Sequence, residues 1–323
     1  MTTVTNIWVG VDVSKKRLDI SIYPTGLEKD FYVTNDINGI QRLIDRISKY
    51  NLIQMVCESS SYEVLMLQMF LKHNLNAWRV EPNRIKSFIR SEGVHVKTDA
   101  SDARMIALFA AQKIRSYDTI AMTAEGLQLD ALSRRRDDLK VAVQAEKNRL
   151  QQFLDEVCQK SVQDTIAFLE GQIDIINTAL DSLISNNPAW AQKRQLMLSV
   201  PGVGPVTSTI LLAQLPELGG ICDRQLASLI GLAPYTRQSG AWKGKSFISG
   251  GRAAIRKVLY MAALVSARHN PPLQAFYKKL RAAGKPTKVA LIAVARKLLI
   301  ILNAILHKSQ PWHYSSISAP GVE

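Results

Sequence analysis

The sequence predicts an α/β domain at the N-terminus, a long helical segment in the middle, and a basic, mainly helical domain at the C-terminus. Strand-like and helix-like runs alternate up to about residue 118, an apolar heptad runs through residues 166–183, and no Asp or Glu occurs from Arg224 to Val322. A length of 323 residues fits two or three domains. We place the domains at residues 1–120, 121–188 and 189–323.

The N-terminal domain is expected to contain a mixed sheet. Three strand-like runs come first, at Ile7–Val13, Arg17–Tyr23 and Phe31–Val33. Helices are then expected at Asn38–Tyr50, Tyr62–Lys72, Pro82–Arg90 and Asp99–Gln112, and strands at Ile53–Cys57 and Ala77–Val80. Hairpin-like strands followed by alternating elements predict an α/β fold with a mixed sheet, in the order expected of a ribonuclease-H-like fold.

The middle segment is expected to be a helical hairpin with a coiled-coil seam. Apolar residues alternate at spacings of three and four, at Ile166, Leu169, Ile173, Ile176, Leu180 and Leu183. A looser seam precedes them, at Leu132, Leu139, Val143, Leu150 and Val157. We expect an antiparallel pair of helices that turns near Gln159–Val162, and such a coiled coil indicates a folded-back arm or a partner chain. One long buried core helix is the alternative.

The C-terminal domain opens with the segment Leu198–Ser208, which resembles a helix-hairpin-helix. Gly202 and Gly204 permit a tight turn, and backbone N–H groups at the start of the next helix can hold a phosphate. A tight turn between two packed helices is the alternative. A basic loop rich in Gly and Ser follows at Thr236–Gly251, and helices are expected at residues 252–268, 272–283 and 286–306.

Positive charge is concentrated in the last hundred residues. Residues 1–223 carry 25 basic and 26 acidic side chains, whereas residues 224–322 carry sixteen Lys and Arg, so the net charge of +14 belongs to the C-terminal part. A field of one sign attracts polyanions and predicts contact with nucleic acid. A ribosomal-type basic surface and a solubility device are the alternatives. The predicted contacts are Arg237, Lys243, Lys245, Arg252, Arg256 and Lys257, with Gly202 and Gly204.

Four carboxylates of the N-terminal domain stand where a metal site would need them. Asp12 ends the first strand, and Glu58 follows the apolar run Ile53–Cys57. Asp99 and Asp102 are three residues apart, on one face of an expected helix. Hard oxygen ligands from three elements suit Mg²⁺ or Mn²⁺. Two such ions about 4 Å apart can activate the attacking oxygen and stabilise the leaving oxygen in phosphodiester chemistry.

Each of these acids also has a structural interpretation. Asp12 could belong to an edge strand, and Glu58 could cap a helix. Asp99 could be an N-cap, with Asp102 in the first turn of the same helix. The other acids of this domain are interpreted as surface charges, namely Asp19, Glu63, Glu81 and Glu92.

Ser239 is the serine of interest in the basic loop, because neighbouring cations could hold a phosphate beside it. Ser246 and Ser249 are rivals in the same loop. Loop serines mostly face solvent or form turns, and no carboxylate or nearby His offers a local base. A nucleophile here would therefore need a base or a metal from elsewhere in the protein.

Several classes of protein are disfavoured by the sequence. Three widely spaced cysteines and five scattered histidines form neither a disulfide framework nor a zinc site. The N-terminus lacks the pattern of a signal peptide, and charged residues interrupt the apolar segment Val289–Leu306, which predicts an amphipathic helix and no membrane span. We expect a cytoplasmic, nucleoid-associated protein.

Motifs along almost the whole chain resemble those of a known family. They are Gly10–Lys15, Glu58 after its strand, Lys97–Arg104, Pro201–Gly204, Leu229–Pro234, Ser239-Gly240 and Ile255–Ala262. In this order they resemble the DEDD transposases of bacterial insertion sequences, the Piv-like group of bridge-RNA-guided serine recombinases. The paired Asp99 and Asp102 and the late Leu-Tyr-Met-Ala element are the most specific of these motifs together.

The resemblance implies a mechanism. The first domain would be RuvC-like, with Asp12, Glu58, Asp99 and Asp102 as its Mg²⁺ tetrad. The basic domain would be the transposase domain, with Ser239 as the nucleophile that becomes joined to DNA. The tetrad of one protomer would work with the serine of another in a tetramer, and a noncoding bridge RNA would pair with donor and target DNA.

Two other functions remain open at this stage. A RuvC-type structure-specific nuclease would use metal-activated water and would cut DNA without a protein adduct. A non-catalytic scaffold would bind nucleic acid with a steep salt dependence, and its acids would be structural. The coiled coil fits all three functions.

Overall fold

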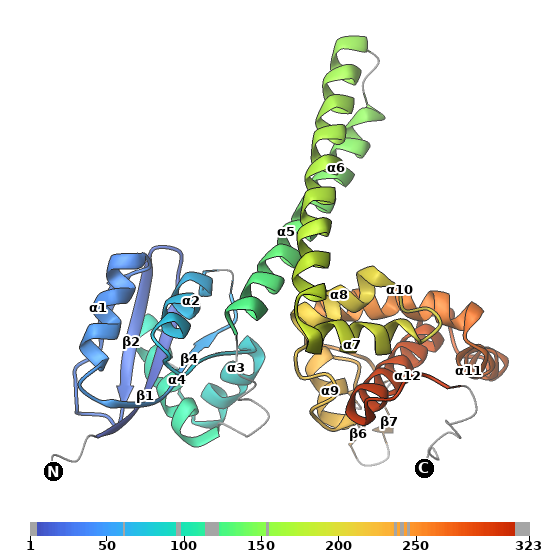
Figure 1. Cartoon of the computed structure of the whole chain (residues 1–323). Helices are drawn as coiled ribbons and strands as arrows, with labels where there is room; N and C mark the ends of the chain where they lie inside the picture. Colours follow the sequence, from blue (N-terminus) through green and yellow to red (C-terminus); the bar gives the residue numbers. More distant parts are fainter. Residues whose placement is uncertain are drawn as a thin grey trace. The chain divides into compact units, whose positions relative to one another are not determined.

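The computed structural model divides the chain into two compact units, Met1–Leu127 and Gln128–Glu323 (Figure 1). It describes residues 5–60, 62–94, 98–113, 123–152, 155–235, 238–239, 242–243 and 246–313. The helical hairpin falls mainly within the second unit, so the further division near residue 188 stays a prediction.

The first unit contains the expected mixed sheet. Its strands are β1 (Asn6–Val13), β2 (Arg17–Tyr23), β3 (Phe31–Thr34), β4 (Asn51–Glu58) and β5 (Ala77–Val80). The strands lie in the order β3-β2-β1-β4-β5. β1, β2 and β3 pair antiparallel, whereas β4 runs parallel to both β1 and β5. The prediction of an α/β domain with a mixed sheet, in which hairpin-like strands precede alternating helices and strands, is confirmed.

Helices cover both faces of this sheet. α1 (Ile37–Ile47) and α2 (Val64–Lys72) pack on one face, in a core with Val9 and Val11. α3 (Pro82–Ser91) and α4 (Asp99–Lys113) pack on the other, in a core with Trp8 and Val56. The membership of the two cores shows which side chains of the strands face α4. It therefore also shows which acidic residues lie on the same side of the sheet as α4.

The helical hairpin consists of α5 (Ala124–Leu150) and α6 (Glu156–Ser185). The six seam residues of α6 are all buried or half-buried, and Lys147 of α5 bonds to Glu170 of α6 at 2.8 Å. The predicted turn at Gln159–Val162 is wrong, because these residues lie inside α6, which begins after the N-cap Asp155. Val157 is 78% exposed and does not belong to the seam.

A helical body completes the second unit. Its helices are α7 (Pro188–Leu198), α8 (Pro205–Gln214), α9 (Asp223–Ile230), α10 (Ala253–His269), α11 (Pro271–Ala282) and α12 (Thr287–Lys308). The strands β6 (Gln238–Ser239) and β7 (Trp242–Lys243) lie between α9 and α10. α12 is long and apolar enough to cross a membrane, but 61% of its most apolar stretch is buried inside the protein. Such burial is typical of a core helix.

Candidate active site

Asp12 lies on the face of β1 that α4 covers. Side chains alternate between the two faces along a strand. Val9 and Val11 pack in the core with α1 and α2, while Trp8 packs in the core with α3 and α4. Asp12 is four residues after Trp8 and therefore points to the same face of β1, the face that α4 covers. It lies near the C-terminal end of the strand. Because β1 is the central strand of the sheet, the interpretation of Asp12 as an edge-strand acid is wrong.

Glu58 lies beside Asp12 at the same end of the sheet. β1 and β4 run parallel, and Val11 is in register with Cys57, so the next residues of the two strands are neighbours. Val56, two residues before Glu58, packs in the core with α4, which places Glu58 on that side as well. Glu58 ends β4 and precedes α2 by several residues, so it does not cap a helix.

Gly10 brings α4 into direct contact with β1. A Cβ atom on Gly10 would lie 2.2 Å from the backbone nitrogen of Ala107 and 2.3 Å from the carbonyl oxygen of Ala103. These are backbone atoms of α4, so only glycine admits this approach. The first turn of α4 carries Asp99 and Asp102, directly before Ala103. The close contact between α4 and β1 thereby brings Asp99 and Asp102 to the sheet that carries Asp12 and Glu58.

Thr98 is the N-cap of α4, so Asp99 and Asp102 in the first turn do not cap the helix. The Thr98 N–H donates to Ser101 Oγ at 2.9 Å, and the Ser101 N–H donates to Thr98 Oγ1 at 3.1 Å. This reciprocal exchange has the form of a capping box. The interpretation of Asp99 as the N-cap is therefore wrong.

The acids of β1 and α4 are close enough to repel one another. The pKa of Asp12 is raised from 3.8 to about 6. Burial is the largest cause, followed by the negative charges of Asp102, Asp99 and Asp19. Carboxylates gathered in this way are hard oxygen donors that fit a divalent cation such as Mg²⁺. Among the described residues, no three acidic, His or Cys side chains are grouped closely enough to hold an ion.

Asp19 belongs to the same end of the sheet, which the sequence interpretation missed. It pairs with Asp12 across β1 and β2, is 5% exposed, and is held by Arg17 through an Nε–Oδ1 hydrogen bond of 3.0 Å. Glu63 is fully buried and forms an ion pair with Arg79. The interpretation of these two acids as surface charges is wrong. The sequence did contain a signal for Asp19. If the residues of the two strands are paired outward from the turn that begins at Ser14, Asp12 lies opposite Asp19.

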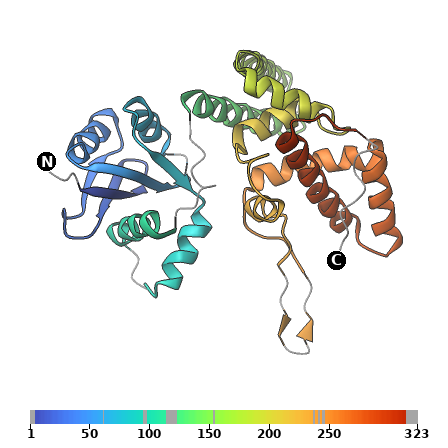
Figure 2. The same ribbon diagram turned by 60° about the horizontal axis from the view of Figure 1, so that its bottom comes forward.

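Ser239 lies in a two-stranded element between α9 and α10. β6 and β7 pair antiparallel, with Ser239 opposite Trp242. Figure 2 shows these two strands, in orange, away from the helices of their unit. The structure describes the backbone of Ser239 and Lys243, whereas Arg237 and Lys245 lie outside the described residues.

Two arginines that were predicted to bind nucleic acid have partners inside the protein. Arg252 forms a bidentate pair with Glu217, at 2.7 Å and 2.5 Å, and donates to the carbonyl oxygen of Gln214 at 2.9 Å. Arg256 donates to two main-chain carbonyl groups at the ends of the segment between α9 and α10. Lys257 is exposed on α10. Positive charge alone did not distinguish an arginine with internal acceptors from one that faces solvent.

The turn between α7 and α8 gives its two glycines different roles. Gly202 has a φ of 102°, and a Cβ atom there would lie 2.1 Å from Ser266 Oγ. The Ser266 hydroxyl also donates to the carbonyl oxygen of Pro201 at 3.0 Å, so Gly202 packs the turn against α10. Gly204 is the N-cap of α8, and among the described residues no atom lies within 4 Å of the position that its Cβ would take. The start of α8 is therefore open at Gly204.

Two family models match the chain. A DEDD transposase model of the IS110 group matches residues 9–159, and a model described as the transposase of the IS116/IS110/IS902 family matches residues 194–278. The first match includes all four acids and much of the hairpin. The second includes Ser239 and both ends of the segment that carries it.

Several insertion-element proteins are similar to the chain. It is 26% identical over 314 residues to the pilin gene-inverting protein of Moraxella bovis, covering 94% of this chain and 97% of that protein. It is 29% identical over 232 residues to the insertion element IS900 uncharacterized 42 kDa protein of Mycobacterium paratuberculosis, covering 68% of this chain and 51% of that protein. The insertion element IS116 uncharacterized 44.8 kDa protein of Streptomyces clavuligerus is 24% identical, with 93% of this chain and 94% of that protein covered.

Proposed function

Because the chain belongs to the DEDD transposase family of insertion sequences, we propose that it cleaves and rejoins DNA strands with a bound divalent metal and a serine nucleophile. The metal ligands would be Asp12, Glu58, Asp99 and Asp102, and the nucleophile would be Ser239. The observation that carries the proposal is the convergence of β1, β4 and the first turn of α4 at one end of the sheet. The strand order supports a RuvC-like, ribonuclease-H-like fold for the first unit.

The acidic residues would hold Mg²⁺, for which Mn²⁺ could substitute. Ions bound there would stabilise negative charge on the attacking and leaving oxygens of a phosphodiester. Asp12 would act as a ligand only when it is ionised, and because its pKa is raised to about 6, metal binding there would depend on pH in the weakly acidic range. Glu58 and the acids of α4 would approach the ion from two further elements.

Ser239 Oγ would attack the phosphorus of the DNA backbone. An Oγ–P ester forms, one P–O bond to a sugar breaks, and the released sugar oxygen takes a proton. Attack by the hydroxyl of a second DNA strand on this ester would rejoin the backbone and release the serine. The body of the second unit offers no spare carboxylate among its described residues, since Glu217 is paired with Arg252 and Asp223 accepts from Asn303 at 2.8 Å. Activation of the serine would therefore come from the four acids of the first unit, in the same chain or in another protomer.

We propose that an element-encoded bridge RNA selects the donor and target DNA. The support is the carboxylate-free stretch of the C-terminal part together with the family resemblance. A basic surface grips the phosphate backbone, and backbone contacts carry no sequence information. Base pairing with an RNA would supply the information that such a surface lacks.

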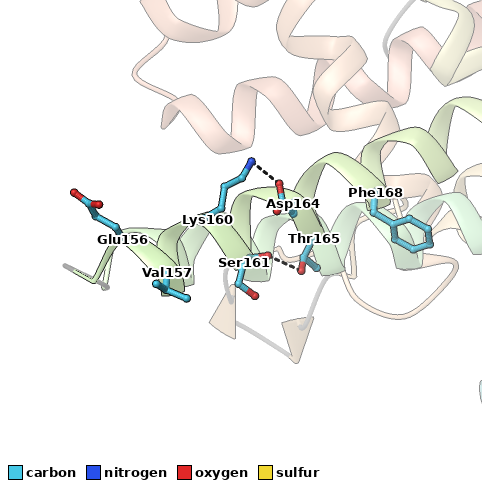
Figure 3. A pocket seen from close by; sticks show the side chains of 7 residues that line it. All are labelled: Glu156, Val157, Lys160, Ser161, Asp164, Thr165 and Phe168. Atoms are coloured by element: carbon cyan, nitrogen blue, oxygen red, sulfur yellow. Dashed lines mark hydrogen bonds and ion pairs between the residues drawn. The ribbon is translucent and has the colours of Figure 1, made fainter.

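We propose that the protein assembles as a homo-oligomer, a tetramer, in part through α6. Three large apolar side chains on α6 are exposed, Val157 by 78%, Phe168 by 64% and Ile175 by 60%. Spacings of eleven and seven residues place them along one line of a helix, apart from the buried seam. The described residues that line a shallow hollow of about 740 Å³ all belong to α6, and they include Val157 and Phe168 (Figure 3). An apolar line of this kind suits a helix of a second copy.

A denaturing gel tests the chemistry. Labelled target DNA is incubated with the protein, the element's flanking RNA and Mg²⁺, and label that migrates with the protein is measured. We expect a DNA-linked band that is absent with Ser239→Ala, absent with Asp102→Asn, and retained with the matched loop variant Ser246→Ala.

Other outcomes of the same gel would support the alternatives. Cleaved DNA without linked protein, in wild type and Ser239→Ala alike, would indicate a nuclease that uses water. DNA binding with a steep salt dependence and no Mg²⁺-dependent cleavage would indicate a scaffold.

A further inference from the structure

The two ends of the segment that carries Ser239 meet in the second unit. We call residues 232–250 the serine arm, which begins after Gly231 at the end of α9 and stops before Gly251. A Cβ atom on Gly231 would lie 2.2 Å from the carbonyl oxygen of Gly250, and one on Gly251 would lie 2.3 Å from the nitrogen of Gly231. Gly231 and Gly251 have φ values of 75° and 66°, in the left-handed region. A side chain at either position would force the ends of the serine arm apart.

Arg256 holds these two ends from α10. Its Nη1 atom donates to the carbonyl oxygen of Ile230 at 3.0 Å and to the carbonyl oxygen of Gly250 at 2.6 Å. Nη1 carries two hydrogens, and these two acceptors use both of them. Hydrogen bonds from a charged donor are roughly twice as strong as neutral ones. One guanidinium nitrogen therefore binds a carbonyl group from each end of the serine arm.

Other contacts extend this closure. The backbone N–H of Arg252 donates to the carbonyl oxygen of Leu229 at 3.1 Å, and this hydrogen bond joins the start of α10 to the end of α9. Farther along the serine arm, Tyr235 and Phe247 pair through backbone hydrogen bonds of 2.8 Å and 3.2 Å. Their rings stack with centroids 6.2 Å apart. The described part of the serine arm thus has a closed base, with the strand that carries Ser239 beyond it (Figure 2).

We propose that Arg256 is a positioning residue, which fixes the direction in which the serine arm presents Ser239 to the scissile phosphate. The inference rests on the proposed role of Ser239 as the nucleophile, and it takes Arg256 out of the predicted set of DNA contacts. Ser239 follows Gly231 by eight residues in the sequence, so a change at the base of the serine arm would change where the serine is presented. A misplacement of about 1 Å can reduce a reaction rate by about 10²-fold.

Arg256→Met tests the role of this guanidinium, and Arg268→Met is its matched control. Arg268 is exposed on the same helix, so its replacement removes the same charge without a described link to the serine arm. We expect Arg256→Met to slow adduct formation at saturating DNA by about 10²-fold, with the DNA affinity and its salt dependence unchanged. Arg268→Met should keep the wild-type rate. Arg256→Lys should recover part of the rate, because an ammonium can reach the carbonyl groups without the planar geometry of the guanidinium.

Limited digestion with trypsin gives a second measurement that does not depend on the chemistry. Cleavage after the basic residues of the serine arm (Arg237, Lys243 and Lys245) should be faster in Arg256→Met than in wild type or Arg268→Met. Ser239→Ala is assayed in parallel. If that variant forms the adduct at the wild-type rate, the proposed nucleophile is wrong, and digestion alone decides the role of Arg256.

Two results would overturn the inference. One is a wild-type adduct rate for Arg256→Met at saturating DNA together with weaker, less salt-dependent binding, which would make Arg256 a phosphate contact. The other is a wild-type digestion pattern for Arg256→Met. If Arg256→Met lowers the melting temperature below the assay temperature, Arg256→Lys decides, and a wild-type rate for that variant overturns the inference.

Discussion

Gly10→Ala should separate α4 from β1 and disable the acidic residues without touching any of them. The added Cβ atom would lie 2.2 Å from a backbone nitrogen of α4, whereas an ordinary van der Waals contact begins at 3.4 Å. The helix therefore has to move by roughly 1 Å, because its backbone cannot rotate away as a side chain can. Overpacking of this kind costs about 1–3 kcal/mol of folding free energy. A shift of about 1 Å in Asp99 and Asp102 should reduce strand cleavage by about 10²-fold.

The control is Gly171→Ala. Gly171 lies within α6, and no atom lies within 4 Å of the position of an added Cβ. This replacement should stabilise the protein by about 0.5–1 kcal/mol, because alanine favours the helix. Thermal melts and Mg²⁺-dependent cleavage are measured for both variants. A Gly10→Ala protein with the melting temperature and cleavage rate of the wild type would refute the packing of α4 on β1.

Four further predictions concern Asp12, Arg252 and Phe168. Mg²⁺ affinity, measured by calorimetry, should rise from about pH 5 to about pH 7 as Asp12 ionises, and a flat profile would count against Asp12 as a ligand. The pKa of Asp12 is higher in the folded protein than its ordinary value, so the folded state favours the neutral carboxyl group. The metal-free protein therefore loses stability as the pH rises from 3.8 to about 6. Asp12→Asn, which stays neutral, should raise the melting temperature at pH 7 while it abolishes cleavage. Arg252→Met should lower the free energy of unfolding in urea by about 2–3 kcal/mol, since Glu217 loses its bidentate partner; a change within experimental error would contradict this. Phe168→Glu should shift sedimentation toward smaller assemblies, and an unchanged distribution would exclude this face of α6 from the oligomer.

Local patterns predicted most of the fold correctly. The alternation at Leu18, Ile20 and Ile22 indicated β2, and the heptad from Ile166 to Leu183 lies on α6 as expected. The hairpin turn was misplaced because the looser seam was extended to Val157. Asp155, whose side chain accepts from the Cys158 N–H at 2.9 Å, was the available signal for the start of the helix.

The arrangement of the candidate site residues followed in part from the sequence, and the features that were missed depend on tertiary contacts. The acids at the ends of β1 and β4 follow from strand order, because parallel strands end at the same side of a sheet. Asp19 was missed because it was considered alone and without its partner across the hairpin. The internal contacts of Arg252 and Arg256 are made with Glu217 and with the main-chain carbonyl groups of Ile230 and Gly250, which only the folded chain brings to these arginines, so charge composition could not indicate them.

Mass spectrometry of the DNA-linked protein tests the central claim most directly. The protein is incubated with Mg²⁺, RNA and target DNA, then digested with trypsin and a nuclease, and peptides that carry a nucleotide phosphate are sequenced. The account predicts a phosphate ester on Ser239 in the wild type and no modified peptide in Asp102→Asn. Cleaved DNA with the ester on another residue, or with no ester at all, would contradict it.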